Sequence, residues 1–218
     1  TTIGSSSFEG CTSLSEIIFP QSIHTIENNA FQGVTDLKIY GNAQNIPPNA
    51  LKNCLSLIKI EINTCNTIFL GSSLFECCSS LKEITIPSSI KTIESNAFQG
   101  IKELTINCFI KRIPENAFKN CSTITKIIFR AKYLETIGAS AFYGCTSLNE
   151  IAIPATIKTI ESDAFQGIAE LTINSEIERI PNEAFKNCST ITKIILNIEK
   201  LATIGASAFE GCNSLTEI

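Results

Sequence analysis

Long apolar runs are absent from this chain of 218 residues. Its hydrophobic stretches are short and are bounded by Ser, Thr, Asn, Gly or charged residues, so none could cross a bilayer as a helix. Methionine is absent altogether, and neither end has the charged and apolar sections of a signal peptide. We therefore expect a fragment of a longer chain, with no membrane insertion within this segment.

Groups that commonly carry catalysis or bind nucleic acid are also scarce. His24 is the only histidine, and there is no GxSxG, P-loop or glycine-rich dinucleotide motif, so neither a catalytic triad nor a phosphate-binding loop can be assembled. Lysines and arginines are dispersed and the net charge is -4, which gives no footprint for phosphate backbones. We expect no enzyme activity, no cofactor, no metal site and no nucleic-acid partner.

An internal repeat is what the sequence does contain. The decapeptide KNCSTITKII occurs at residues 119–128 and again at 186–195. One position, usually Phe in the phrase AF, marks every unit, and we call it the anchor. The anchors are Phe8, Phe31, Leu51, Phe75, Phe98, Phe118, Phe142, Phe165, Phe185 and Phe209, with intervals of 23, 20 and 24 that sum to 67 and then recur. Such a period predicts a solenoid in which each unit buries its apolar side against its neighbours.

The repeated block of three units indicates one continuous array over residues 1–218, with blocks at 1–67, 68–134 and 135–201 and a partial block at 202–218. After each anchor comes an aliphatic residue, two variable residues, an aliphatic, one variable residue and an aliphatic, as in Leu81, Ile84 and Ile86. The alternating part predicts a short strand with one face inward. Because this strand recurs once per coil, the strands should stack into a parallel sheet.

The rest of each unit should form the back of the coil. An aliphatic residue precedes every anchor by five positions, and a small residue, usually Ala, directly precedes most anchors, which favours a tight helical or 3-10 turn. Gly or Asn follows most anchors by two positions, as at Gly100 and Asn120, and both residue types tolerate positive φ.

The phrases LxxIxIP and TIxxxAFxGC, taken from residues 81–100 and 136–145, resemble the BspA-like class of leucine-rich repeats over essentially the whole chain. The resemblance implies a right-handed leucine-rich-repeat solenoid of about ten coils, with a parallel β-sheet on the concave side and short helical or 3-10 turns and loops on the convex side. It also implies kinship with cell-surface proteins that bind host proteins or other cells. Departures such as Leu51 at an anchor leave the fold unchanged and the ligand open.

Seven of the ten cysteines follow an anchor by three positions and should form an inward column, in which a free thiol acts as a small buried hydrophobe. The shortest unit lacks this position, so Cys54 lies beside Cys78, with equivalent pairs in the later blocks. Disulfides across adjacent coils are sterically conceivable, but we favour free thiols. Cys65, Cys77 and Cys108 lie off the column and have no metal-ligand spacing.

The outward positions of the strands are the candidate partner-binding site. One outward column of charges runs from Glu16 to Glu217, and we favour a solvated ladder of cross-strand pairs over a dedicated acidic stripe. The next column contains isoleucines that should be exposed, which indicates either a protein-binding patch or strand formers left by duplication. The candidate residues are Ile18, Lys38, Tyr40, Lys59, Glu83, Glu103, Lys126, Ile128, Arg130, Tyr133, Glu150, Glu170, Lys193 and Ile195.

Our leading hypothesis is a non-enzymatic recognition module of a cell-surface or secreted adhesion protein, which binds proteins or glycans through its concave sheet. The alternative is an intracellular, cytoplasmic scaffold for protein interaction, which fits unpaired cysteines better. Neither end of the array carries an atypical capping unit, so we also expect end-to-end self-association of the isolated coils.

Overall fold

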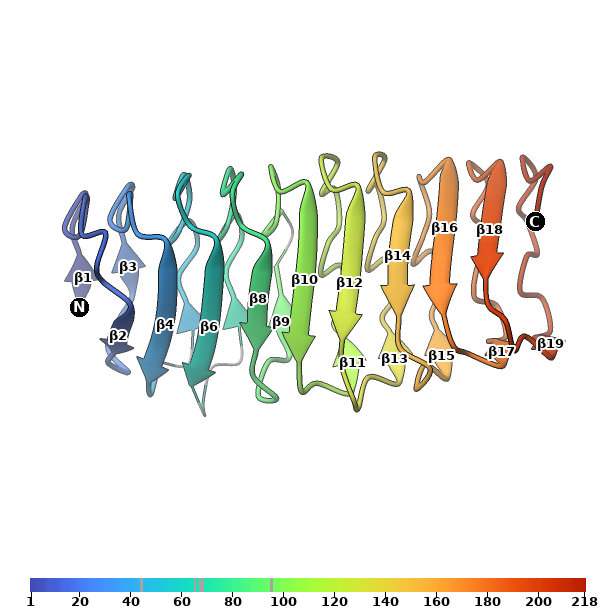
Figure 1. Ribbon diagram of the computed structural model, residues 1–218, viewed down its shortest axis with the longest axis horizontal. Coiled ribbons are helices and arrows are strands. Elements are labelled where there is room, and N and C mark those ends of the chain that lie inside the picture. Colours follow the sequence, from blue (N-terminus) through green and yellow to red (C-terminus); the bar gives the residue numbers. More distant parts are fainter. Residues whose placement is uncertain (44, 65, 67–68, 95) are drawn as a thin grey trace.

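Coils stacked in one direction make up the molecule (Figure 1). The computed structural model describes residues 1–43, 45–64, 66, 69–94 and 96–218. One longer strand per coil enters a nine-stranded sheet, the long sheet, in which all neighbouring strands are parallel. Its strands are β2 (Glu16–Phe19), β4 (Asp36–Gly41), β6 (Lys59–Thr64), β8 (Glu83–Ile86), β10 (Glu103–Cys108), β12 (Lys126–Arg130), β14 (Glu150–Ile153), β16 (Glu170–Ser175) and β18 (Lys193–Asn197). The predicted solenoid with its parallel sheet is confirmed.

A two-residue strand on the opposite side of each coil was not predicted. These short strands are β1 (Thr2–Ile3), β3 (Thr25–Ile26), β5 (Asn45–Ile46), β7 (Phe69–Leu70), β9 (Thr92–Ile93), β11 (Arg112–Ile113), β13 (Thr136–Ile137), β15 (Thr159–Ile160), β17 (Arg179–Ile180) and β19 (Thr203–Ile204). Each ends on the aliphatic residue five positions before the anchor. They pair in parallel as four separate small sheets, β1-β3, β5-β7-β9, β11-β13-β15 and β17-β19.

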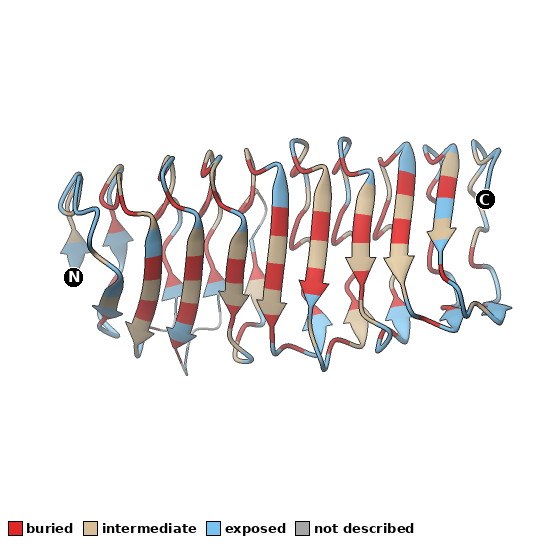
Figure 2. Cartoon of the chain, in the orientation of Figure 1, coloured by how far each residue is buried: buried red, intermediate tan, exposed pale blue. Residues whose placement is uncertain are grey.

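The core is a continuous column between the long sheet and the short strands, visible as the buried bands that recur along the long strands in Figure 2. Its centre is a ladder of anchor rings. From Phe75 to Phe209 successive rings are stacked with centroids 4.8 to 5.4 Å apart. Leu51 interrupts this ladder and is itself fully buried. Because each ring packs on rings of neighbouring coils, no coil has a complete core of its own.

Hydrogen-bonded turns, without helix, carry the chain past the anchor in the described residues, so the expectation of short helical or 3-10 turns is wrong. The reason is backbone geometry. The residue two positions after the anchor has positive φ in every coil, as predicted for Gly and Asn and also at Cys77. The residue two positions before the anchor has positive φ as well, for example Asn29, Ser140 and Glu183. Two left-handed residues four positions apart prevent a right-handed helical turn from continuing.

Proline explains why the short strands form four sheets instead of one. Most coils donate a backbone N–H, four positions before the anchor, to the preceding coil, as Glu161 does to the Ile137 carbonyl at 3.0 Å. The equivalent residues in the shortest coils are Pro47, Pro114 and Pro181, which have no N–H. The ladder is therefore cut between β3 and β5, between β9 and β11, and between β15 and β17.

Side-chain hydrogen bonds join two of these interrupted steps near the anchor. Gln99 accepts the Ser122 backbone N–H at 3.2 Å and donates to the Ser122 hydroxyl at 3.3 Å, while Gly100 donates its N–H to the Thr123 hydroxyl at 2.9 Å. The same bonds recur one block later between Gln166, Gly167 and residues 189–190. The Ser-Thr pair within the repeated decapeptide thus replaces missing contacts at the coil boundary.

The prediction of an inward column of cysteines is confirmed for the interior coils and is wrong for Cys11, the first of the seven. Cys54, Cys121 and Cys188, and also Cys78 and Cys145, are buried. Cys11 is exposed because it lies in the first coil of the structure, where no preceding coil covers it. The thiols of Cys78, Cys145 and Cys212 donate to the anchor carbonyls of the preceding coils at 2.9 to 3.0 Å. Cys212, in the last coil, is half-buried.

All nine described cysteines are free, and Cys65 lies outside the described residues. Of the other two cysteines off the column, Cys77 is half-buried and Cys108 is buried. Burial raises the pKa of Cys121 and of Cys188 to about 12 and the pKa of Cys108 to about 11. These thiols are therefore neutral, inert parts of the core.

Two substitutions of an interior anchor should show how much stability is lost with the aromatic ring and how much with the opening of a cavity. Phe118→Leu introduces the residue that already occupies the anchor at Leu51, so we expect a loss of about 1 kcal/mol in unfolding free energy. Phe118→Ala leaves a cavity between two stacked rings and should cost about 3–5 kcal/mol. Urea unfolding followed by far-UV circular dichroism measures both, and equal losses would contradict the shared-core explanation.

The rate of alkylation should distinguish the exposed thiol of Cys11 from the buried thiols of the cysteine column. At pH 8 iodoacetamide should modify Cys11, whereas Cys121 and Cys188 should react about a thousandfold more slowly, because the thiolate is the nucleophile and burial both raises the pKa and blocks access. Mass spectrometry of the digested protein gives the rate at each site. In urea the three rates should converge; rapid labelling of Cys121 in the native protein would show that the coils do not stack as described.

Candidate functional site

The solvent-facing side of the long sheet, which we call the sheet face, carries most of the candidate binding residues. The predicted column of charges is not continuous there. Three strand pairs, β2-β4, β8-β10 and β14-β16, are offset by two residues from the repeat, so that Glu83 lies opposite Thr105 and Glu150 opposite Thr172. The offset keeps Glu83 from facing Glu103. Like charges directly opposite each other destabilise a sheet, so this register removes an unfavourable pair.

One interstrand lysine–glutamate pair per block remains on the sheet face. The Nζ atoms of the lysines lie 3.3 Å from the carboxylate in Lys59–Glu83 and 2.6 Å from it in both Lys126–Glu150 and Lys193–Glu217. In each pair the acid belongs to the following coil. The acids of the preceding coils, Asp36, Glu103 and Glu170, lie opposite the lysines without an ion pair among the described residues. The pairs lie at the surface in contact with solvent, so screening by water and salt keeps the contribution of each to stability small.

Amide side chains extend two of these pairs, and the sequence analysis missed them. The Asn107 amide donates to Glu83 at 2.6 Å, and the Asn174 amide donates to Glu150 at 3.0 Å. Both contacts exist because the two-residue offset places the asparagine beside the glutamate. The recurrence of Asn at 107 and 174 was the available signal, but a sequence pattern within one coil does not reveal the offset between coils.

The apolar candidates on the sheet face differ in exposure. Ile18 is 75% exposed and lies opposite Tyr40, while Ile195 is 42% exposed, as expected. Ile128 was expected to be exposed and is only half-buried, because Thr105 and Ala152 flank it on both neighbouring strands. A hollow of about 260 Å³ adjoins Ile195, between β14, β16 and β18.

Three further candidate residues are Lys38, Arg130 and Tyr133. Lys38 is half-buried opposite Glu61, and Arg130 is exposed as the last residue of β12, opposite Asn107. Tyr133 lies beyond the end of β12, in the loop that leads to β13, and is 56% exposed. The structure therefore brings the lysine–glutamate pairs and the isoleucines onto one face and places Tyr133 on its flank.

The opposite side of the molecule has hollows where proline cuts the short sheets. The largest, of about 1010 Å³, lies between β15 and β17 and is lined by Lys158, Glu161, Arg179 and Pro181 among others. Smaller hollows of about 410 and 310 Å³ occur at the two equivalent steps. His24 lines the smallest of them and is exposed, in agreement with its interpretation as a surface substitution.

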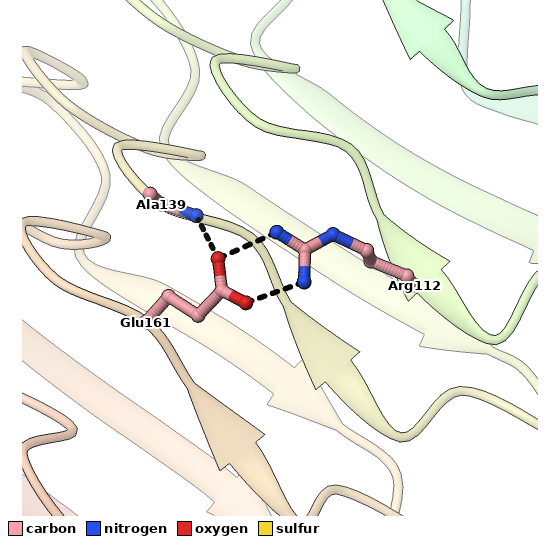
Figure 3. A network of polar contacts seen from close by, with 3 residues as sticks. All are labelled: Arg112, Ala139 and Glu161. Carbon is pink, nitrogen blue, oxygen red and sulfur yellow. Dashed lines mark hydrogen bonds and ion pairs between the residues drawn. The ribbon is translucent and has the colours of Figure 1, made fainter.

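An ion pair spans two coil steps on this side (Figure 3). The two terminal guanidinium nitrogens of Arg112, Nη1 and Nη2, donate to the carboxylate of Glu161, which also accepts the Ala139 N–H at 3.0 Å. Arg112 is the main reason that the pKa of Glu161 lies below its usual range. Glu27 and Glu94, at the same repeat position, accept the equivalent N–H groups of Ser5 and Ser72. The carboxylate–backbone bond is therefore part of the repeat. The arginine occurs at its repeat position in the second block (Arg112) and in the third (Arg179), whereas the first block has Asn45 there.

Within the described ranges no group of three or more His, Cys, Asp or Glu side chains is arranged to hold a metal ion. The same ranges contain no helix that is long and apolar enough to cross a membrane.

Three solved structures illustrate what this chain is similar to. A leucine-rich-repeat protein from Bacteroides ovatus is 21% identical, with a TM-score of 0.36, over 100% of this chain and 70% of its own. The Drosophila Toll - Spatzle complex contains a chain that is 17% identical, with a TM-score of 0.50, over 98% of this chain and 28% of its own. A leucine rich cell surface protein from Faecalibacterium prausnitzii is 17% identical, with a TM-score of 0.28, over 94% of this chain and 82% of its own. The search of curated proteins found no match.

The family described as "BspA type Leucine rich repeat region (6 copies)" matches residues 1–125 and 111–218, which together span the whole sequence. The repeat read from the anchors, the stacked coils and this match therefore agree, and the chain belongs to the BspA-type leucine-rich-repeat family.

Proposed function

We propose that this chain is a non-enzymatic recognition module of a cell-surface or secreted protein, which binds protein or glycan partners through the sheet face. Membership of the family shows that the chain is a repeat protein with a fold used for protein interaction. The role in adhesion and the choice of face are the proposal. The family resemblance supports the surface location, since members are commonly cell-surface proteins.

Periodic presentation is the observation that carries the proposal. The lysine–glutamate pair recurs once per block on a continuous surface of parallel strands. Three coils separate successive pairs, which is about 14 Å at the usual strand spacing. A partner with a repeated surface could engage several pairs at once, and weak contacts then gain affinity from high effective concentration.

Apolar side chains between the lysine–glutamate pairs provide apolar contact area for a partner, which the charged groups alone would not. Ile195 and the half-buried Ile128 lie two positions beyond Lys193 and Lys126 on the same strands, and therefore on the same face. Surface-exposed aliphatic groups beside paired charges can be desolvated by a partner at little cost, whereas free charges would have to lose their water.

Replacing both isoleucines should weaken binding without changing the fold. Ile128→Thr with Ile195→Thr introduces the residue that Thr105 and Thr172 already supply in the neighbouring coils. We expect the fluorescent double variant to bind about tenfold more weakly to intact cultured mammalian cells, measured by flow cytometry. Tyr143→Gln, on the turn side, serves as the matched control, because Gln99 and Gln166 occupy its repeat position. Equal losses in both variants would rule out a specific role for the sheet face.

An intracellular scaffold is the second candidate. The nine cysteines that the structure describes are all free, which favours it, since thiols stay reduced in the cytosol. Protease treatment of intact cells that make the protein separates the two. We expect an antibody against this segment to lose its signal without cell lysis. A signal that persists until detergent is added would reject the surface location and favour the scaffold.

A further inference from the structure

One repeat position departs from the pattern in two adjacent coils only. The residue nine positions before the anchor is polar in the other coils and aromatic at Phe109 and Tyr133. Through the chain this position reads Ser22, Asn42, Asn66, Ser89, Phe109, Tyr133, Thr156, Glu176 and Lys200. These two aromatic side chains are not part of the hydrophobic core, because Phe109 is 59% exposed and Tyr133 is 56% exposed.

The two aromatic residues are neighbours on the flank where the long strands end. Phe109 lies between β10 and β11, and Tyr133 lies between β12 and β13, loops that run side by side in Figure 1. Two positions beyond each ring the coils are joined, because Glu135 donates its N–H to the Lys111 carbonyl at 2.8 Å. The residues that follow the rings, Ile110 and Leu134, are buried. The rings are thus fixed at the surface one coil apart.

Three cations lie within three positions of these rings along the chain. Lys111, Arg130 and Lys132 are exposed and have no ion-pair partner in the part of the chain that the structure describes. Two acids of this region are already engaged, since Glu135 lies 3.1 Å from Lys158 and Glu161 binds Arg112. A third, Glu115, is exposed and lies close enough to Arg112 to add to the effect of Glu161 in raising the pKa of that arginine. A chain with net charge -4 therefore carries a local surplus of positive charge here. We call Phe109, Lys111, Arg130, Lys132 and Tyr133 the flank patch.

The equivalent flank of the third block has the opposite chemistry. The positions one block after Phe109 and Lys111 are Glu176 and Glu178, both exposed. Arg130 and Lys132 are replaced there by Asn197 and Glu199. The flank patch is thus a local change in an array whose core positions are almost copies, so the requirements of folding do not account for it.

We propose that the flank patch is a second interaction surface, which adjoins the sheet face at Arg130 and binds an acidic protein segment carrying an apolar side chain. Exposed aromatic residues beside arginine are the side chains enriched at protein interfaces. Two rings at coil spacing cover an apolar side chain, while the three unpaired cations attract Asp and Glu on either side of it. The charge complementarity also predicts that binding weakens as salt rises.

Peptide pools test this proposal before any partner is identified. The chain is immobilised and offered fluorescent dodecapeptide pools composed of Asp, Glu, Leu and Phe, or of Asn, Gln, Leu and Phe, and also a sulfated oligosaccharide. We expect retention of the acidic, apolar pool only. The variant Phe109→Asn with Tyr133→Thr uses residues found at this position in other coils and should lower retention about tenfold.

Charge reversal gives the second measurement. Lys111→Glu introduces the residue that Glu135 and Glu178 supply at the same repeat position, and it should also reduce retention about tenfold. Lys82→Glu, an exposed lysine at the other end of the long strands, makes the same change in net charge and should leave retention unchanged. Ile128→Thr with Ile195→Thr should leave it unchanged as well.

Four results would overturn the proposal. Failure to retain the acidic, apolar pool, or equal retention by wild type and the Phe109 and Tyr133 double variant, would show that the patch is not the binding surface. Retention of the neutral pool to the same extent would show that the cations have no role. Preferential retention of the sulfated oligosaccharide would reassign the patch to an anionic glycan.

Discussion

Stacking of one coil on the next is the interaction on which the rest of this structure depends. A single coil is too short to enclose its own apolar side chains, so its anchor ring is covered by rings of the coils before and after it. The long sheet and the short strands add backbone hydrogen bonds across the same steps. Every inward position is therefore held to a narrow choice of residues, and outward positions are free to differ.

Proline limits this stacking at regular points. Pro47, Pro114 and Pro181 remove one donor each, and the side of the molecule opposite the long sheet opens into hollows at those steps. The long sheet continues through all of them. One side of the solenoid is thus an uninterrupted surface, and the other is divided into segments of up to three coils. An extended binding surface is better placed on the uninterrupted side.

Inward features could be predicted from the sequence, because one coil's pattern is enough to identify a strand, an anchor or a glycine turn. Features that depend on how two coils meet could not. The two-residue offset that separates Glu83 from Glu103 is invisible within a coil, and it decides which charges pair. Ile128 is half-buried for a related reason, since its neighbours are set by register. The second left-handed position, two residues before the anchor, had a signal in its Asn and Ser residues, but helix formation was expected there.

Photo-crosslinking from defined positions would test the central claim, that partners bind the sheet face, most directly. The photoreactive residue benzoylphenylalanine is placed at position 128 on the sheet face or at position 143 on the turn side, and the chain is irradiated on intact cells to which it binds. We predict that position 128 gives a discrete crosslinked partner and that position 143 does not. Crosslinking from 143 alone, or equally from both positions, would contradict recognition through the sheet face.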